Sequence, residues 1–221
     1  MIAILYSFRR CPYAMRGRMA LAISGLDYEH REVLLRDKPA SMLKFSPKAT
    51  VPVFVTTSGE VVEESFDLMH YALGQNDPEG WLAGKDAAAD RFITDNDGPF
   101  KHHLDRYKYA SRYSEDAKRG DVDLTHRTEA EVYIAKLEDR LTASPYLAGE
   151  ARGFADIAIF PFIRQFANTD RTWWDGPQTK EDGNKTPPYP AVHKWLTGLM
   201  DSDLFKQIMI KHPLWVDIPQ H

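Results

Sequence analysis

Cysteine is almost absent from this chain, since Cys11 is the only one among 221 residues. A single cysteine cannot form an internal disulfide, and the first residues lack the basic segment, long apolar core and small-residue cleavage site of a secretory signal. Both observations favour a reducing, cytoplasmic setting. No apolar run approaches the ~18 residues that a membrane-spanning helix needs, so we expect no membrane partner.

An excess of charge of one sign is also lacking. The 28 basic and 32 acidic residues are mixed along the chain and give a net charge of −4. Without a basic stripe, the surface offers no electrostatic footprint for nucleic acid. The hydrophobic content of 43% is ordinary for a folded globular protein, and the length allows one large or two modest domains, of which we favour two.

The first part of the chain alternates strand and helix signals. The apolar run at residues 2–8 is typical of a buried strand, and the spacing of apolar residues after Pro12 predicts a helix. A strand, a helix and a second strand in this order favour a parallel crossover. The predicted elements are a strand at 2–8, a helix from Pro12 to about Ser24, a strand at 28–35, a short helix or turn at 37–45, a hairpin around Ser58-Gly59 and a helix at 65–74.

The rest of the chain carries helical patterns separated by polar or Pro/Gly-containing joints. The segment 77–86 is rich in turn-forming residues and predicts a linker. The apolar segment FADIAIFPFIRQFA predicts a buried helix that Pro161 kinks or opens in its first turns. The predicted elements are a helical stretch at 87–112 that can break at Gly98-Pro99, helices at 125–143 and 154–167, a long loop at 169–190, and helices at about 190–200 and 202–211.

Cys11 falls where the first predicted strand has ended and the next helix begins, with Pro12 at the first helical position. The free amides and the macrodipole of a helix N-terminus favour a thiolate and can lower a thiol pKa from ~8.5 to about 3.5–7.5. A lone cysteine elsewhere is most often a small buried hydrophobe, but this position favours a reactive thiol. The nearby positive charges are Arg9, Arg10, Arg16 and Arg18.

Three short motifs occur in a fixed order. Cys11-Pro12-Tyr13-Ala14 opens a helix, Val51-Pro52 precedes a hairpin, and Glu64-Ser65 opens a later helix. In this order and spacing the chain resembles the glutathione transferases, most closely their omega-like, cysteine-containing group with a glutaredoxin-like active-site sequence. The FADIAIFPF segment resembles the helical second half of that family, so the resemblance covers almost the whole chain.

The resemblance implies a two-domain α/β protein. Its N-terminal thioredoxin-like domain has the order β-α-β-α-β-β-α and binds glutathione, and its C-terminal domain is all-α. The expected bounds are residues 1–76 for the first domain, 77–86 for the linker and 87–221 for the helical domain. Glutathione is the expected co-substrate.

The resemblance also implies where glutathione binds. Val51 would offer its backbone N–H and C=O so that a peptide-like ligand adds as a strand, and the Val51-Pro52 bond is a candidate for the cis form. Glu64 would receive the ammonium group of the γ-glutamyl end, and Ser65 its carboxylate. Lys38 matches the position that meets the glycyl carboxylate. The residues alone leave open a trans turn, a plain helix cap and a surface lysine. The implied substrate-binding residues are Pro12, Tyr13, Lys38, Val51, Pro52, Glu64 and Ser65.

Cys11 is the expected catalytic nucleophile. Ala14 stands where a dithiol oxidoreductase has its second cysteine, so a second glutathione has to resolve a mixed disulfide on Cys11. This predicts thiol transfer or reductive deglutathionylation, and the resemblance adds dehydroascorbate-type reduction. A route through a hydroxyl of Tyr6 or Ser7, as other transferase classes use, ranks second.

Two other functions remain open. One is conjugation, in which glutathione's own sulfur attacks a small electrophile, and the other is ligand binding without catalysis. The expected partners are glutathione and a small hydrophobic or glutathionylated substrate, in a role such as detoxification, and relatives suggest a homodimer. The histidine and cysteine spacing forms no zinc pattern, so no metal is expected.

Two further features concern the second half. Asp156 corresponds to the family's buried helix-capping aspartate, but Gly153 leaves the capping box incomplete, so we expect a role in folding only. A group of aromatic residues could line a pocket for an electrophile, although aromatics at helical spacing are more often core. That group is Tyr107, Tyr109, Tyr113, Trp173 and Trp174.

Overall fold

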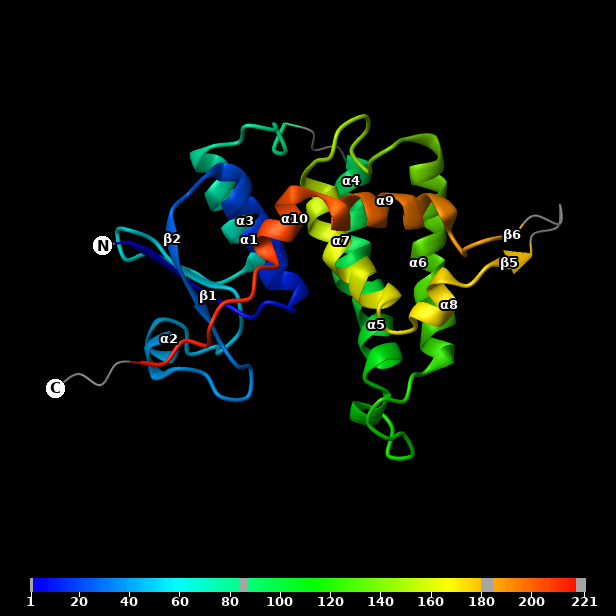
Figure 1. Ribbon diagram of the computed structural model, residues 1–221, viewed down its shortest axis with the longest axis horizontal. Helices are drawn as coiled ribbons and strands as arrows, with labels where there is room; N and C mark the ends of the chain where they lie inside the picture. The colour runs from blue at the N-terminus through cyan, green and yellow to red at the C-terminus, as the bar shows by residue number, and fades with distance from the viewer. Residues whose placement is uncertain (1, 84–86, 180–184, 218–221) are drawn as a thin grey trace. The chain divides into compact units, whose positions relative to one another are not determined.

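The computed structural model of the protein describes residues 2–83, 87–179 and 185–217 (Figure 1). They divide into two compact units. Unit 1 contains the chain up to Leu82 together with the residues from Asp201 onward, and unit 2 runs from Ala83 to Met200. None of the described helices is long and apolar enough to cross a membrane.

Unit 1 begins with the predicted order β-α-β-α-β-β-α. The four-stranded sheet has the order β2-β1-β3-β4, in which β1 runs parallel to β2 and antiparallel to β3. This mixed sheet confirms the predicted crossover and the thioredoxin-like fold. The elements are β1 (Ala3–Ser7), α1 (Pro12–Ser24), β2 (Tyr28–Glu32), α2 (Ala40–Phe45), β3 (Val53–Val55), β4 (Val61–Val62) and α3 (Ser65–Gln75).

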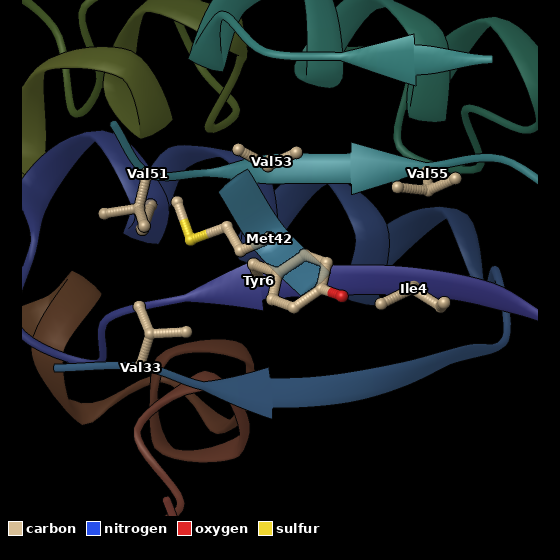
Figure 2. Close-up of a cluster of buried hydrophobic side chains, with 8 residues drawn as sticks. Ile4, Tyr6, Val33, Met42, Val51, Val53 and Val55 are labelled. Carbon is tan, nitrogen blue, oxygen red and sulfur yellow. The ribbon is translucent and has the colours of Figure 1, made fainter. Parts of the chain in front are cut away.

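The core of unit 1 forms because its central strands are mostly apolar. All five residues of β1 and all three of β3 are buried, as expected for strands covered on both faces. Figure 2 shows the cluster of buried side chains on one face of the sheet, to which Tyr6 of β1, Val53 of β3 and Met42 of α2 belong. On α1, a Cβ at Gly17 would lie 2.5 Å from Leu68 Cδ2 of α3, so a larger residue at this position would displace the buried Leu68 side chain.

In the described part of unit 2, the regular elements are helices and one pair of short antiparallel strands. The predicted stretch at 87–112 is not interrupted at Gly98-Pro99. Instead, a π-helical turn absorbs Pro99, which has no N–H to donate. The elements are α4 (Ala87–Asp95), the π-helix Asn96–Phe100, α5 (Lys101–Lys108), the 3-10 helix Ala110–Arg112, α6 (Leu124–Ala143), α7 (Phe154–Ala167), α8 (Arg171–Asp175), β5 (Gln178–Thr179), β6 (Lys185–Thr186) and α9 (Pro190–Asp201).

The structure corrects the long loop predicted at 169–190. Asp170 accepts a hydrogen bond from Trp173 N–H and begins α8, and the paired strands β5 and β6 follow. Two-residue strands are too short for an alternating pattern to reveal. Residues 180–184 of the predicted loop, and 84–86 of the predicted linker, lie outside the described residues.

The last residues differ from their predicted place in the helical domain 87–221. From Asp201 onward, including α10 (Asp203–Ile208), they belong to unit 1. Trp215 N–H donates to Glu32 O at 2.8 Å, beside the edge strand β2. The Arg31 guanidinium lies 3.9 Å from the Trp215 ring centroid, and Asp217 accepts from Ser41 N–H at 2.8 Å. These long-range contacts leave no local sequence signal.

One contact of this C-terminal segment makes unit 1 sensitive to acid. The rings of His30 and His212 stack with their centroids 4.0 Å apart. Burial and the neighbouring His30 lower the pKa of His212. An unfolded chain, with an imidazole pKa of about 6.5, binds the proton before the folded chain does. The neutral His212 therefore contributes fully to the free energy of unfolding above about pH 6.5, and this contribution is lost as the pH falls further.

We expect the His212→Gln variant to lose less thermal stability than the wild type between about pH 7.5 and 5.5. Between these two pH values, the Tm of the variant should fall by about 2 °C less than the Tm of the wild type, a small effect because solvent screens a partly exposed imidazole. The exposed His70 on α3 provides the control substitution His70→Gln. Equal changes of Tm in the wild type and in His212→Gln would contradict this assignment.

Candidate functional site

Cys11 is the N-cap of α1, where its backbone is extended at φ −72° and ψ 123°. Its N–H donates to Phe8 O at 3.0 Å, and its C=O accepts from Met15 N–H at 2.9 Å. Pro12 follows at the first helical position, as predicted, and is buried. The Cys11 side chain is partly exposed and packs against the apolar cluster of Figure 2. A nucleophile at this place has the helix amides beside it and solvent within reach.

The structure brings Cys11 together with the turn before β3. Cys11 Sγ lies 3.9 Å from Val51 O, which is the distance of a weak S–H···O hydrogen bond. The Val51-Pro52 peptide is cis, as predicted, and both residues are buried. Among the described residues, no backbone group pairs with Val51, whose C=O faces the Cys11 sulfur.

Glu64 and Ser65 lie at the start of α3. Glu64 is the N-cap residue, with 64% of its side chain exposed, whereas Ser65 is buried. The Glu64 carboxylate forms an ion pair with Lys48 at 2.5 Å, and this bond raises the pKa of Lys48. The sequence did not single out Lys48. An exposed pair of this kind is weak, so a ligand ammonium group can compete for Glu64.

A groove of about 450 Å³ borders Glu64. Carboxylates dominate it, so its potential suits a cation. The lining residues are Lys48, Glu60, Val61, Val62, Glu63, Glu64, Asp67 and Tyr71.

Two predicted binding residues have other contacts in this structure. Lys38 Nζ donates to Leu35 O at 2.5 Å. The Tyr13 ring centroid lies 5.4 Å from the guanidinium carbon of Arg16, and the Tyr13 side chain is partly exposed. The Lys38 ammonium has three donors, so the bond to Leu35 O leaves donors for other partners.

The two hydroxyl groups that ranked second as activators are fully buried. Tyr6 OH accepts from Arg31 Nη1 at 2.7 Å, and Ser7 Oγ accepts from Arg18 Nη1 at 2.5 Å. Both side chains are 0% exposed, so neither hydroxyl is placed to donate a hydrogen bond to a ligand thiolate. The geometry favours Cys11 over both.

The structure corrects part of the predicted aromatic pocket. Tyr107 and Trp174 are 0% and 1% exposed and belong to the core of unit 2. Both lie against Phe166, with ring centroids 5.3 and 6.0 Å away. Tyr113, by contrast, is 50% exposed. Helical spacing does not distinguish a core aromatic residue from one that lines a pocket.

No group of three or more His, Cys, Asp or Glu side chains that could hold a metal ion occurs among the residues with described positions. The adjacent His102 and His103 form an aromatic group with His126, in which His103 Nδ1 lies 2.8 Å from His126 Nδ1. Burial lowers the pKa of His103, and the charges of His126 and Arg106 lower it further.

Comparisons with known proteins agree with this geometry. Models of the glutathione S-transferase N-terminal and C-terminal domains match residues 5–80 and 98–198. Glutathione S-transferase U19 of Arabidopsis thaliana is 27% identical over 173 residues, which make up 75% of this chain and 76% of that protein.

Solved structures share the fold. Glutathione S-transferase-I bound with lactoylglutathione gives a TM-score of 0.70 at 21% identity and covers 95% of this chain and 99% of its own. Glutathione transferase Omega 3C of Trametes versicolor gives a TM-score of 0.70 at 19% identity, with 97% and 91% covered.

A thioredoxin-like domain with a mixed four-stranded sheet, followed by a helical domain, is the fold of glutathione-binding transferases. The chain belongs to the glutathione S-transferase superfamily.

Proposed function

We propose that this protein is a glutathione-dependent thiol transferase of the omega-like, cysteine-containing type, with Cys11 as its nucleophile. One observation carries the proposal. The partly exposed Cys11 Sγ sits at the N-cap of α1, 3.9 Å from the backbone oxygen of Val51. This arrangement places a thiol next to a backbone edge that can hold a peptide-like ligand.

Glutathione would be held through its charged ends and its backbone. Val51 pairs with the cysteinyl part of glutathione, so that the glutathione sulfur lies beside Cys11. The ammonium group of the γ-glutamyl end faces Glu64, next to the acidic groove, and its carboxylate meets Ser65 and the amides of α3. Lys38 would meet the glycyl carboxylate, and Pro12, Tyr13 and Pro52 would form the walls of the glutathione site.

The chemistry needs only one protein sulfur. The Cys11 thiolate attacks the glutathione sulfur of a glutathionylated substrate, a new S–S bond forms, and the substrate leaves as a thiolate that takes up a proton. A second glutathione thiolate then attacks the mixed disulfide on Cys11. Oxidised glutathione leaves and the Cys11 thiolate is restored. Ala14 offers no second sulfur, so this step is intermolecular.

Conjugation to a small hydrophobic electrophile is the second candidate. The named relatives favour it, because they are called glutathione S-transferases and not thiol transferases. In this reaction glutathione's own sulfur is the nucleophile, and Cys11 only holds it. Dehydroascorbate-type reduction would follow the thiol-transfer route.

The cellular setting and assembly are part of the same proposal. A chain with a single cysteine and a dependence on reduced glutathione fit a cytoplasmic protein with a role in detoxification. A homodimer is the assembly we propose.

The direct test is mass spectrometry of the intact protein after incubation with oxidised glutathione near neutral pH. We expect one adduct with the mass of a glutathionyl group, released by a reductant, because the Cys11 thiolate attacks the disulfide. Protein alkylated beforehand at Cys11 should gain no adduct. Absence of the adduct from the untreated protein would count against the thiol-transfer cycle.

The same measurement tests the binding residues. Ser65→Ala removes a hydrogen bond to a charged carboxylate, so the adduct should form about tenfold more slowly at limiting oxidised glutathione. Ser58→Ala, in the hairpin turn, is the matched control and should react at the wild-type rate. Equal rates in both variants would mean that glutathione does not use Ser65.

A further inference from the structure

Arg18 is a buried arginine on α1 whose hydrogen bonds converge on the segment that joins β1 to α1. The residue is 1% exposed. Its Nη1 donates to Ser7 Oγ at 2.5 Å and to Phe8 O at 3.4 Å. Its Nη2 donates to Arg9 O at 2.7 Å, and its Nε to Ile208 O at the end of α10 at 3.1 Å. The guanidinium therefore ties this segment to α10.

The turn from Phe8 to Cys11 determines where the sulfur lies. Cys11 N–H donates to Phe8 O, the same oxygen that accepts from Arg18. From the other side, Arg9 N–H donates to Glu32 Oε1 at 2.7 Å. Arg9 is thus held through both its N–H and its C=O, and the turn that ends at Cys11 is fixed from two directions.

The guanidinium also carries a charge into this buried place. Its hydrogen-bond acceptors are uncharged oxygen atoms. Burial lowers the pKa of Arg18 to about 10, while the charges of Glu32, Tyr28 and Cys11 act in the opposite direction. Arg18 is therefore a cation at neutral pH. Because the attraction between two charges is mutual, this cation favours the thiolate of Cys11.

We propose that Arg18 is a positioning residue for Cys11, which fixes the turn that carries the sulfur and supplies a buried positive charge that favours the thiolate. The proposal deepens the proposed function, since it concerns the same nucleophile. Arg18 acts without touching glutathione, because its side chain is buried. A lysine could supply the charge, but its single ammonium group cannot reproduce the planar fork that bonds Ser7, Arg9 and Ile208 together.

The test is the rate of Cys11 alkylation by iodoacetamide between about pH 4 and 9, the range over which protein thiols ionise. Cys11 is the only cysteine, so the rate reports this site alone. In Arg18→Met, the midpoint of the pH profile should move up by about one unit, and the rate below the midpoint should fall about tenfold. Alkylation uses no glutathione, so its result is separate from success or failure of the glutathione adduct test.

Arg140→Met in unit 2 is the matched control. Arg140 Nε also donates to a backbone oxygen, that of Leu147 at 2.9 Å. This variant loses a comparable bond and should keep the wild-type pH profile. A folded Arg18→Met variant with the wild-type midpoint would overturn the proposal, with the fold checked by thermal unfolding.

If Arg18→Met does not fold, Arg18→Lys tests the same proposal. It keeps the cation, so the midpoint of its pH profile should stay within one pH unit of the wild-type midpoint. It loses the fork, so the turn is no longer held in place, and the rate at full ionisation should change by at least about threefold. Wild-type values of both the midpoint and the rate in this variant would overturn the proposal.

Discussion

Cys11→Ser is expected to lower thiol transfer by at least about a thousandfold and to keep conjugation within about tenfold of the wild type. Thiol transfer needs a protein sulfur that forms a disulfide with glutathione, and a hydroxyl cannot form one. Conjugation needs only a group that holds the glutathione thiolate, which a serine hydroxyl can do by donating a hydrogen bond. Rates with a glutathionylated peptide and with an activated aryl chloride, measured on the same preparation, separate the two activities.

Cys11→Ala is the matched variant, because it removes the sulfur and leaves no hydroxyl. It should lose thiol transfer as fully as Cys11→Ser, and its conjugation rate should be lower than that of the serine variant. Thiol transfer retained in both variants would remove Cys11 from the mechanism. If the wild type and both variants all lack activity on thiols and electrophiles, the protein is a binding module that kept the fold.

The local parts of the candidate site could be predicted from sequence because each rests on neighbouring residues. A proline at the first helical position places Cys11 at the N-cap of α1, and the structure has this cap. The bond between Val51 and Pro52 was a candidate for the cis form and is cis. The partners from distant segments could not be predicted. Lys48 pairs with Glu64 across 16 residues of sequence.

Arg18 is a second residue whose partners could not be predicted from the sequence. Its sequence position indicates only that a positive charge lies on the helix after Cys11. Its role depends on an acceptor 190 residues away, Ile208 O, and on burial that no local pattern reveals. The C-terminal segment that returns to unit 1 was missed for this reason too. Helix periodicity predicts that α10 forms, but not which core it joins.

Asp156→Ala is expected to lower the free energy of unfolding of unit 2 by about 3–5 kcal/mol, a large share of the roughly 5–15 kcal/mol of a typical domain. Asp156 is 0% exposed. It accepts from Leu147 N–H and Gly153 N–H, both at 2.9 Å, and from Trp195 Nε1 at 2.8 Å. Alanine leaves these three donors buried without an acceptor. Urea unfolding followed by tryptophan fluorescence measures the loss.

Burial is what makes this carboxylate so important, and Glu138→Ala tests that reason. Glu138 also accepts two backbone N–H groups, those of Ala191 at 3.0 Å and Val192 at 2.9 Å, where α9 begins. It is only partly buried, so water can replace the lost oxygens, and the expected cost is about 1 kcal/mol. Losses in proportion to the number of donors, three for Asp156 and two for Glu138, would show that the number of hydrogen bonds, and not their burial, sets the stability that Asp156 contributes.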